Sequence, residues 1–439
     1  MLLKFPHHSQ VEAADVADFA FPANVRLKRI DVTQSATGIH SILYGSKQFQ
    51  RADNCHVFLL KTQHNIANPN EPEDLYGICV RAHEMASLPD TDGKMHDISC
   101  PIAYCILSRH PFFELHQAVI MQILMLLHLK RVKHLGQLST ESDHAAIMKL
   151  RGKPLGPHQV PACVQLLKKF YDMPLPQRGQ SITLTASKLL QPIQFHRPAM
   201  GKSETHTLIA QWNCNLAWTH ITPEMLLDLL ELALREAKII VVDKNLGMLS
   251  AAVYSLAPLL SPLKWSGVFL PILPSKLSEF LEAPVPIIAG VVELPAAMSG
   301  LMDGSVHAGE EETMAIWFPS QGRLQMPKVW KRLLPNRSQL LQALKPHFTE
   351  LRRLAPVTPP SRTLPHQLRY ETTVEELAHI KIMLHLIETE LVNYIAYVRQ
   401  TLMDLAIVDK KMNSFIQLFR ETQMLSHYLQ SHEYEEDDY

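Results

Sequence analysis

The chain has little net charge and a low share of charged residues. Lys and Arg together number 42, Asp and Glu number 43, and the formal net charge at pH 7 is −1. Strong binding to nucleic acid or to acidic lipid needs clustered Lys and Arg, so this balance argues against both partners. The sequence also has no run of about 18 uncharged apolar residues, so we expect no membrane-spanning helix.

Cysteine spacing excludes the common zinc and redox motifs. No two of the six cysteines have the C-x-x-C spacing that these motifs use. The first segment, "MLLKFPHHSQVEAAD", has no apolar core long enough for a secretory signal. We therefore expect a cytoplasmic protein whose thiols are reduced and mostly buried. The cysteines are Cys55, Cys79, Cys100, Cys105, Cys163 and Cys214.

Histidine is abundant, with 23 residues, but its spacing does not favour a metal site. On helices, metal-binding histidines lie three or four residues apart because that spacing places both rings on one face. The pairs in helix-like segments of this chain are six residues apart and point to different faces. These pairs are His110/His116, His128/His134 and His379/His385. We expect no bound metal.

The motifs of phosphate-binding loops and common active sites are also missing. The chain has no G-x-G-x-x-G, G-x-S-x-G or H-E-x-x-H motif. Gly201-Lys202-Ser203 matches the end of a phosphate-binding loop, but that loop needs a glycine five positions before Gly201, where this chain has His196. We therefore expect no cofactor and no enzyme active site.

The middle of the chain has the pattern of a parallel α/β sheet. Residues 223–237 predict an amphipathic helix with Thr222 as N-cap and Pro223 in its first turn. The next run, "KIIVVD", is apolar on both faces like a central parallel strand, so we expect Ile240 and Val242 to be buried. Another helix and the strands "WSGVFL" and "VPIIAGV" complete the unit.

Two carboxylates near these strands are candidates for chemistry. Asp243 follows the apolar strand at its carboxyl end, where open α/β sheets place their ligand sites. It is either a catalytic acid or, as we predict, a solvated turn residue that caps the following helix. Glu282 has no close carboxylate partner in the sequence, so a paired acid–base mechanism has no obvious second member.

Proline density and hydrophobic periodicity divide the chain into five parts. Apolar residues recur every three or four positions after Thr373 and Glu376, which together predict a capping box and a long helix. The predicted parts are an N-terminal α/β lobe at 16–133, a proline-broken linker at 134–205, a core α/β module at 206–335, a helical module at 336–430 and an acidic tail at 431–439.

Three segments carry a resemblance to a known family: "YCILSRHPFFEL" at 104–115, residues 237–291, and "FIQLFRETQML" at 415–425. In this order and spacing they resemble the upstream, core and downstream modules of the DENN domain. The core segment resembles its counterpart nearly from end to end, including the P-x-L-P turn at 271–274 and the E-A-P-V-P run at 282–286.

Members of the DENN-domain family are typically guanine-nucleotide exchange factors for Rab GTPases. The resemblance implies a bilobed α/β fold, with a longin-like N-terminal lobe and a three-layer DENN lobe followed by helices. It implies that a Rab GTPase docks across both lobes, and it is compatible with peripheral recruitment to endomembranes. Two other functions stay open: a non-catalytic scaffold that binds a GTPase, and a GTPase-activating protein with Arg109 as the inserted arginine.

The resemblance and the sheet pattern together select five polar residues for contact with the partner. Each has a simpler alternative as a helix cap or a solvated surface residue. One departure bears on exchange activity, since Pro319 and Ser320 stand where the family has acids. The predicted partner-binding residues are Arg109, Glu114, Lys244, Asn245 and Glu282.

Overall fold

The computed structural model describes most of the chain, and the account below is confined to the described residues. The half-motif at Gly201–Ser203 and the last six residues of the predicted acidic tail lie outside them. The described residues are 4–6, 12–23, 25, 28–29, 55–62, 73–89, 92–138, 156–188, 190–199, 204–295, 298, 314–355, 372–403 and 410–433.

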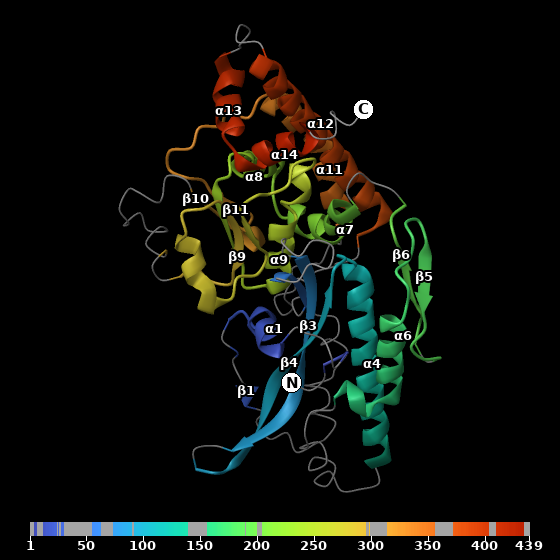
Figure 1. Cartoon of the computed structure of the whole chain (residues 1–439). Helices are drawn as coiled ribbons and strands as arrows, with labels where there is room; N and C mark the ends of the chain where they lie inside the picture. Colours follow the sequence, from blue (N-terminus) through green and yellow to red (C-terminus); the bar gives the residue numbers. More distant parts are fainter. Residues whose placement is uncertain are drawn as a thin grey trace. The chain divides into compact units, whose positions relative to one another are not determined.

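The chain is a mixed α/β protein that divides into two compact units (Figure 1). The first unit contains Met1–Cys55 and Leu60–Lys202, and the second contains His56–Leu59 and Ser203–Tyr439. Each unit has its own sheet and its own covering helices, and each is described by itself below.

The four-stranded sheet has the strand order β1-β4-β3-β2, and it belongs to the first unit apart from His56–Leu59 of β2. β3 and β4 form its long antiparallel ladder, in which Cys79 lies opposite Cys105 and Glu84 lies opposite Cys100. The β-rich runs "CHVFLL", "LYGICVRA" and "AYCILS" each fall inside one of these strands. The bounds are Lys28–Arg29 for β1, Cys55–Thr62 for β2, Glu73–Pro89 for β3 and Met95–Ser108 for β4.

Helix α4, Phe113–Leu138, is the long helix of the first unit, and it packs on β3, β4, α6 and β6 (Figure 1). α6 buries Cys163 and Leu166 completely. These elements occupy the described part of the segment expected to be a linker. The remaining bounds are Ala13–Ala20 for α1, Pro157–Gln159 for the 3₁₀ turn η2, Pro161–Tyr171 for α6, Ser181–Leu184 for β5 and Ile193–His196 for β6.

The sheet of the second unit has the order β11-β10-β7-β9-β8. β7 runs parallel to both of its neighbours, so the predicted central parallel strand is confirmed. Ile240 is buried as expected, but Val242 is only half-buried because it ends the strand. The bounds are Lys238–Val242 for β7, Val268–Leu270 for β8, Ile287–Val291 for β9, Met314–Phe318 for β10 and Arg323–Gln325 for β11.

Alternate residues of this sheet supply its two apolar faces. Ile240, Ala289 and Ile316 belong to one buried cluster, which Leu281 of η4 also joins. Gly290 points to the other face, where an added Cβ would lie 2.4 Å from the Pro271 carbonyl oxygen and 3.0 Å from the Leu249 side chain. The close approach of α9 and of the turn after β8 therefore requires glycine at this position.

The described residues of the second unit include seven α-helices. α9 packs on β7 and β9, α11 packs on α8 and α12, and α12 packs on α7. The capping box of α12 is confirmed, because Thr373 Oγ1 accepts from the Glu376 N–H at 3.2 Å and Glu376 accepts from the Thr373 N–H at 2.7 Å. The helices are α7 at Glu204–Trp218, α8 at Pro223–Leu234, α9 at Leu246–Tyr254, α11 at Arg337–Leu354, α12 at Val374–Met403, α13 at Lys410–Arg420 and α14 at Gln423–Glu433. The short 3₁₀ segments are η3 at Pro258–Leu260, η4 at Ser275–Glu282 and η5 at Pro319–Gln321.

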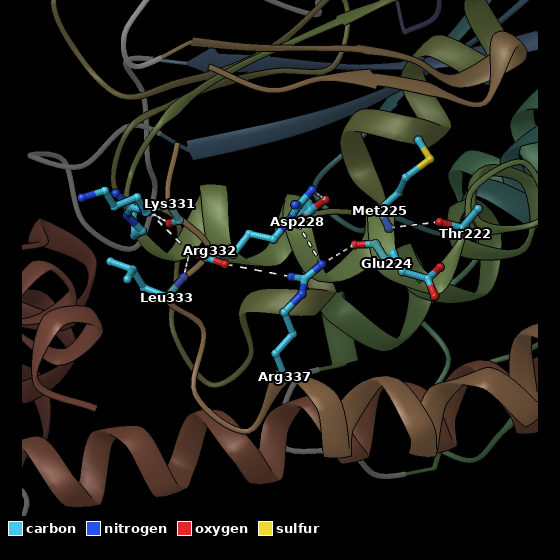
Figure 2. A network of polar contacts seen from close by, with 10 residues as sticks. Thr222, Glu224, Met225, Asp228, Lys331, Arg332, Leu333 and Arg337 are labelled. Atoms are coloured by element: carbon cyan, nitrogen blue, oxygen red, sulfur yellow. Dashed lines mark hydrogen bonds and ion pairs between the residues drawn. The ribbon is translucent and has the colours of Figure 1, made fainter. Parts of the chain in front are cut away.

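A buried ion-pair network ties the segment after β11 to α8 (Figure 2). Asp228 of α8 accepts from Arg332 Nε at 2.8 Å and from its Nη2 at 3.0 Å, in a two-point contact. Arg337 Nη2, from the first residue of α11, lies 2.8 Å from the same carboxylate. Glu231, one turn along α8, accepts from the Leu333 N–H at 2.7 Å. The network fixes where α11 begins.

Candidate partner-binding surface

Asp243 forms hydrogen bonds that link the carboxyl ends of β7, β9 and β10, at the carboxyl edge of the parallel sheet. Its own N–H donates to Val291 O at 3.2 Å, at the end of β9. Its Oδ1 accepts from the Asn245 N–H at 2.9 Å, and its Oδ2 accepts from the Ser320 N–H at 3.0 Å, just after β10. Asp243 is 8% exposed, so the prediction of a solvated residue is wrong. The carboxylate joins neighbouring turns instead.

Asn245 is the N-cap of α9, so the prediction that Asp243 caps this helix is also wrong. Its Oδ1 accepts from the Gly247 N–H at 3.0 Å and from the Met248 N–H at 3.2 Å. The cap geometry requires the side chain directly before the first helical residue, and Asp243 stands two residues too early. The Asn245 side-chain oxygen is therefore occupied by the helix, which restricts what a partner can contact.

Lys244 is open to a partner. Its side chain is 82% exposed and its Nζ lies 3.4 Å from Glu293 Oε1, whose side chain is 72% exposed. A pair this exposed contributes little to folding, so both charges are available at little cost to stability. Glu293 was not singled out in the sequence. Its position two residues after β9 could have indicated it, because parallel strands end at the same edge.

Glu282 does not join this group. It is exposed at the last position of η4, and the preceding Leu281 carbonyl accepts from Lys238 Nζ at 2.7 Å. Lys238 is the first residue of β7, whereas Lys244 follows the last one. A strand rises about 3.3 Å per residue, so these two edges of the sheet are roughly 15 Å apart. The sequence-predicted residues of the second unit therefore lie at opposite ends of β7.

Arg109 and Glu114 lie together on one connection in the first unit. Arg109 is exposed directly after the last residue of β4, and Glu114 is exposed in the first turn of α4. The connection between them is held by the His110 N–H, which donates to Ser108 Oγ at 3.1 Å, and by the buried Phe112. A carboxylate in a first turn also stabilises the helix dipole, so Glu114 has a structural use here as well.

Pro319 and Ser320 lie at the carboxyl edge that Asp243 organises. They begin the 3₁₀ turn η5, and the contact to Asp243 uses the backbone N–H of Ser320. Any residue other than proline supplies that donor, so the edge keeps its geometry without the acids of the family pattern.

Two further features, a cluster of metal ligands and a membrane-spanning helix, are absent from the described residues. No three His, Cys, Asp or Glu side chains among them are grouped to hold a metal ion. His347 of α11 and His379 of α12 form a pair, with their Nδ1 atoms 3.0 Å apart. None of the helices described is both long and apolar enough to cross a bilayer.

The family model for the DENN (AEX-3) domain matches residues 99–299. This part of the chain is therefore similar to a DENN domain. The matched segment contains all five predicted partner-binding residues, together with Asp243 and Glu293. Pro319 and Ser320 lie beyond its end.

Curated relatives match shorter segments. The chain is 34% identical over 120 residues to Elicitor of plant defense protein 1 of Fusarium odoratissimum, which is 26% of this chain and 13% of that protein. It is 46% identical over 67 residues to a DENN domain-containing protein of Schizosaccharomyces pombe, or 15% of this chain and 7% of that protein. It is 26% identical over 128 residues to DENN domain-containing protein 1B of Mus musculus, which is 29% of this chain and 16% of that protein. The matches thus span less than a fifth of these relatives.

Proposed function

We propose that this protein is a guanine-nucleotide exchange factor for a Rab-type GTPase in membrane trafficking. The observation that carries the proposal is the family match over residues 99–299. That segment includes both polar sites described above, the β4–α4 connection of the first unit and the carboxyl edge of the second. The proposal includes a longin-like fold for the first unit, a bilobed layout and the division into upstream, core and downstream modules.

Exchange needs a protein surface and no covalent chemistry. An exchange factor binds the nucleotide-free GTPase more tightly than the nucleotide-bound form, and by reciprocity it lowers the affinity of the GTPase for nucleotide. A thousandfold faster release corresponds to about 4 kcal/mol of barrier lowering. Contacts over a standard interface of roughly 1,600 Å² suffice if they favour the distorted GTPase.

The carboxyl edge suits this role because its backbone is held from within. Asp243 and Asn245 together accept four backbone N–H groups, so the turns at this edge are fixed before any partner arrives. A preorganised surface loses less conformational entropy on binding. The exposed charges of Lys244 and Glu293 then remain for the partner.

A panel of Rab proteins loaded with fluorescent GDP tests the proposal. The full chain should accelerate GDP release from at least one Rab by about a thousandfold at saturation, with release by EDTA as the positive control. A second function, a GTPase-binding scaffold, is favoured by the missing acids at Pro319 and Ser320. Binding without faster release would support the scaffold, and faster phosphate production would support a GTPase-activating protein.

A further inference from the structure

Two cysteines of the first unit lie directly opposite each other on neighbouring strands. Cys79 on β3 pairs with Cys105 on β4 in the antiparallel ladder. Opposite residues project from the same face of a sheet, with Cα atoms about 4.5 or 5.5 Å apart. Disulfides form at Cα separations of about 4.4–6.8 Å. The register of the ladder therefore places the two Cα atoms within the range that a disulfide spans.

The other cysteines of the chain provide a natural comparison. Cys100 and Cys105 lie on the same strand, β4, and both are half-buried. Cys100, however, lies opposite the buried Glu84 and so has no thiol across the ladder. Cys163 is completely buried on α6 and donates to Ile123 O at 3.8 Å. Although both are half-buried on one strand, Cys100 and Cys105 are five residues apart and project from opposite faces of the sheet, and of the two only Cys105 lies opposite a thiol.

We propose that Cys79 and Cys105 are a reversible redox site, which forms a disulfide between β3 and β4 on exposure to a small disulfide oxidant such as glutathione disulfide. The half-buried Cys105 reacts first. Its thiolate attacks one sulfur of glutathione disulfide, a mixed disulfide forms, and the first glutathione leaves as a thiolate that takes up the proton lost by Cys105. The Cys79 thiolate then attacks the Cys105 sulfur and the second glutathione leaves, also protonated. Two electrons pass from the two cysteines to glutathione disulfide, which becomes two glutathione molecules.

The second step sets the rate of closure. Burial, and then the neighbouring Cys105, raises the pKa of the Cys79 thiol well above its ordinary value. Its thiolate is therefore scarce at neutral pH, and closure should accelerate with rising pH because the thiolate is the nucleophile. The mixed disulfide on Cys105 should consequently be detectable as an intermediate.

Mass spectrometry of the folded full chain tests this proposal. After incubation with glutathione disulfide, most of the protein should carry a Cys79–Cys105 bridge, found as one linked peptide and lost on treatment with dithiothreitol. Cys100 should carry glutathione and form no bridge. In Cys79→Ser, glutathione should persist on Cys105, whereas Cys105→Ser should show neither the adduct at position 105 nor the bridge.

Three outcomes would overturn the proposal. The first is glutathione that persists on Cys105 of the wild-type chain as long as in Cys79→Ser. The second is a bridge from Cys105 or Cys79 to Cys55, the buried thiol of β2, in place of the bridge across the ladder. The third is no reaction at Cys105 while Cys100 reacts. Circular dichroism of each variant shows whether it is folded. Cys105 is only half-buried, so Cys105→Ser provides a test if Cys79→Ser, at a buried position, fails to fold.

Discussion

At the scale of single residues, His116 on α4 shows how burial controls a titratable group. It is 3% exposed and its ring lies edge-on to Phe170. Burial, with a smaller contribution from His110, lowers its pKa to about 3. The folded protein therefore keeps His116 neutral at pH values where the unfolded chain, with a pKa of 6.5, already binds a proton.

The stability of the protein should consequently fall as pH drops from 6.5 towards 3. Its full contribution is present above the unfolded pKa, because there both states are neutral. Between pH 7 and pH 5, wild-type protein should lose about 2 kcal/mol more than His116→Leu, measured by urea denaturation. His158→Leu, at an exposed histidine of the same unit, is the matched control and should keep the wild-type dependence. Equal pH slopes for wild type and His116→Leu would show that His116 titrates normally.

Asn245 is a second residue whose role can be isolated. Asn245→Ala should destabilise the protein by about 1 kcal/mol, because the Gly247 and Met248 N–H groups lose their acceptor. Asn245→Asp keeps an acceptor and should stay close to wild type. Lys244→Ala, at the neighbouring exposed residue, should change stability by less than about 0.5 kcal/mol. Urea denaturation gives the free energy of unfolding of the three variants. An Asn245→Ala protein as stable as wild type would show that the Asn245 side chain does not stabilise α9 as its N-cap.

At the scale of elements, α8 is held by its carboxylates. Burial raises the pKa of Glu231, while the Leu333 N–H, Arg235 and Arg337 act in the opposite direction. Arg235 also donates to Lys331 O at 3.1 Å and lies over the Trp330 ring at 3.6 Å. One helix thereby positions the whole segment that leads into α11.

Asp228→Ala tests that arrangement, because it leaves Arg332 and Arg337 without their shared carboxylate. The loss should be about 2–3 kcal/mol, below the range for fully buried pairs since the Arg332 side chain is 57% exposed. Glu224→Ala is the matched control, one turn earlier on α8. Its carboxylate pairs with Lys345 at 3.6 Å and both side chains are about half exposed, so it should cost less than about 0.5 kcal/mol. Similar losses for both variants in thermal denaturation would show that burial of Asp228 is unimportant.

At the scale of the whole molecule, the proposed exchange activity depends on residues from both units. The triple variant Arg109→Ala, Lys244→Ala, Glu282→Ala should keep its melting temperature within a few degrees, because all three side chains are exposed. It should lose GDP release on the cognate Rab, since a hot-spot truncation weakens binding by about 2 kcal/mol or more.

The structure sharpens this experiment, because Lys244 and Glu282 lie at opposite edges of one sheet. Lys244→Ala and Glu282→Ala measured separately should differ in their effect on exchange, with Lys244→Ala the larger. Arg178→Ala and Lys381→Ala, at exposed residues of the first and second units, are the controls and should leave GDP release unchanged. Undiminished release by the triple variant would place the partner surface elsewhere.

Local signals in the sequence predicted the elements that depend on neighbouring residues. The both-face apolar run at 239–242 became the central strand β7, and the capping box of Thr373 and Glu376 begins α12. These signals are readable because periodicity and caps arise from contacts within a few residues. The family resemblance rested on similarly contiguous segments.

Contacts between distant segments could not be read in the same way. β9 lies between β7 and β8 although it follows both in the chain, and this order places Val291 beside Asp243. The six-residue spacing predicts that His379 and His385 lie on different faces of their helix, but it gives no sign that His379 meets His347 of another helix. Cys79 faces Cys105 because a strand turns back on its neighbour. Such pairings depend on the path of the chain through space, which the packing of a whole core specifies and no short stretch of residues encodes.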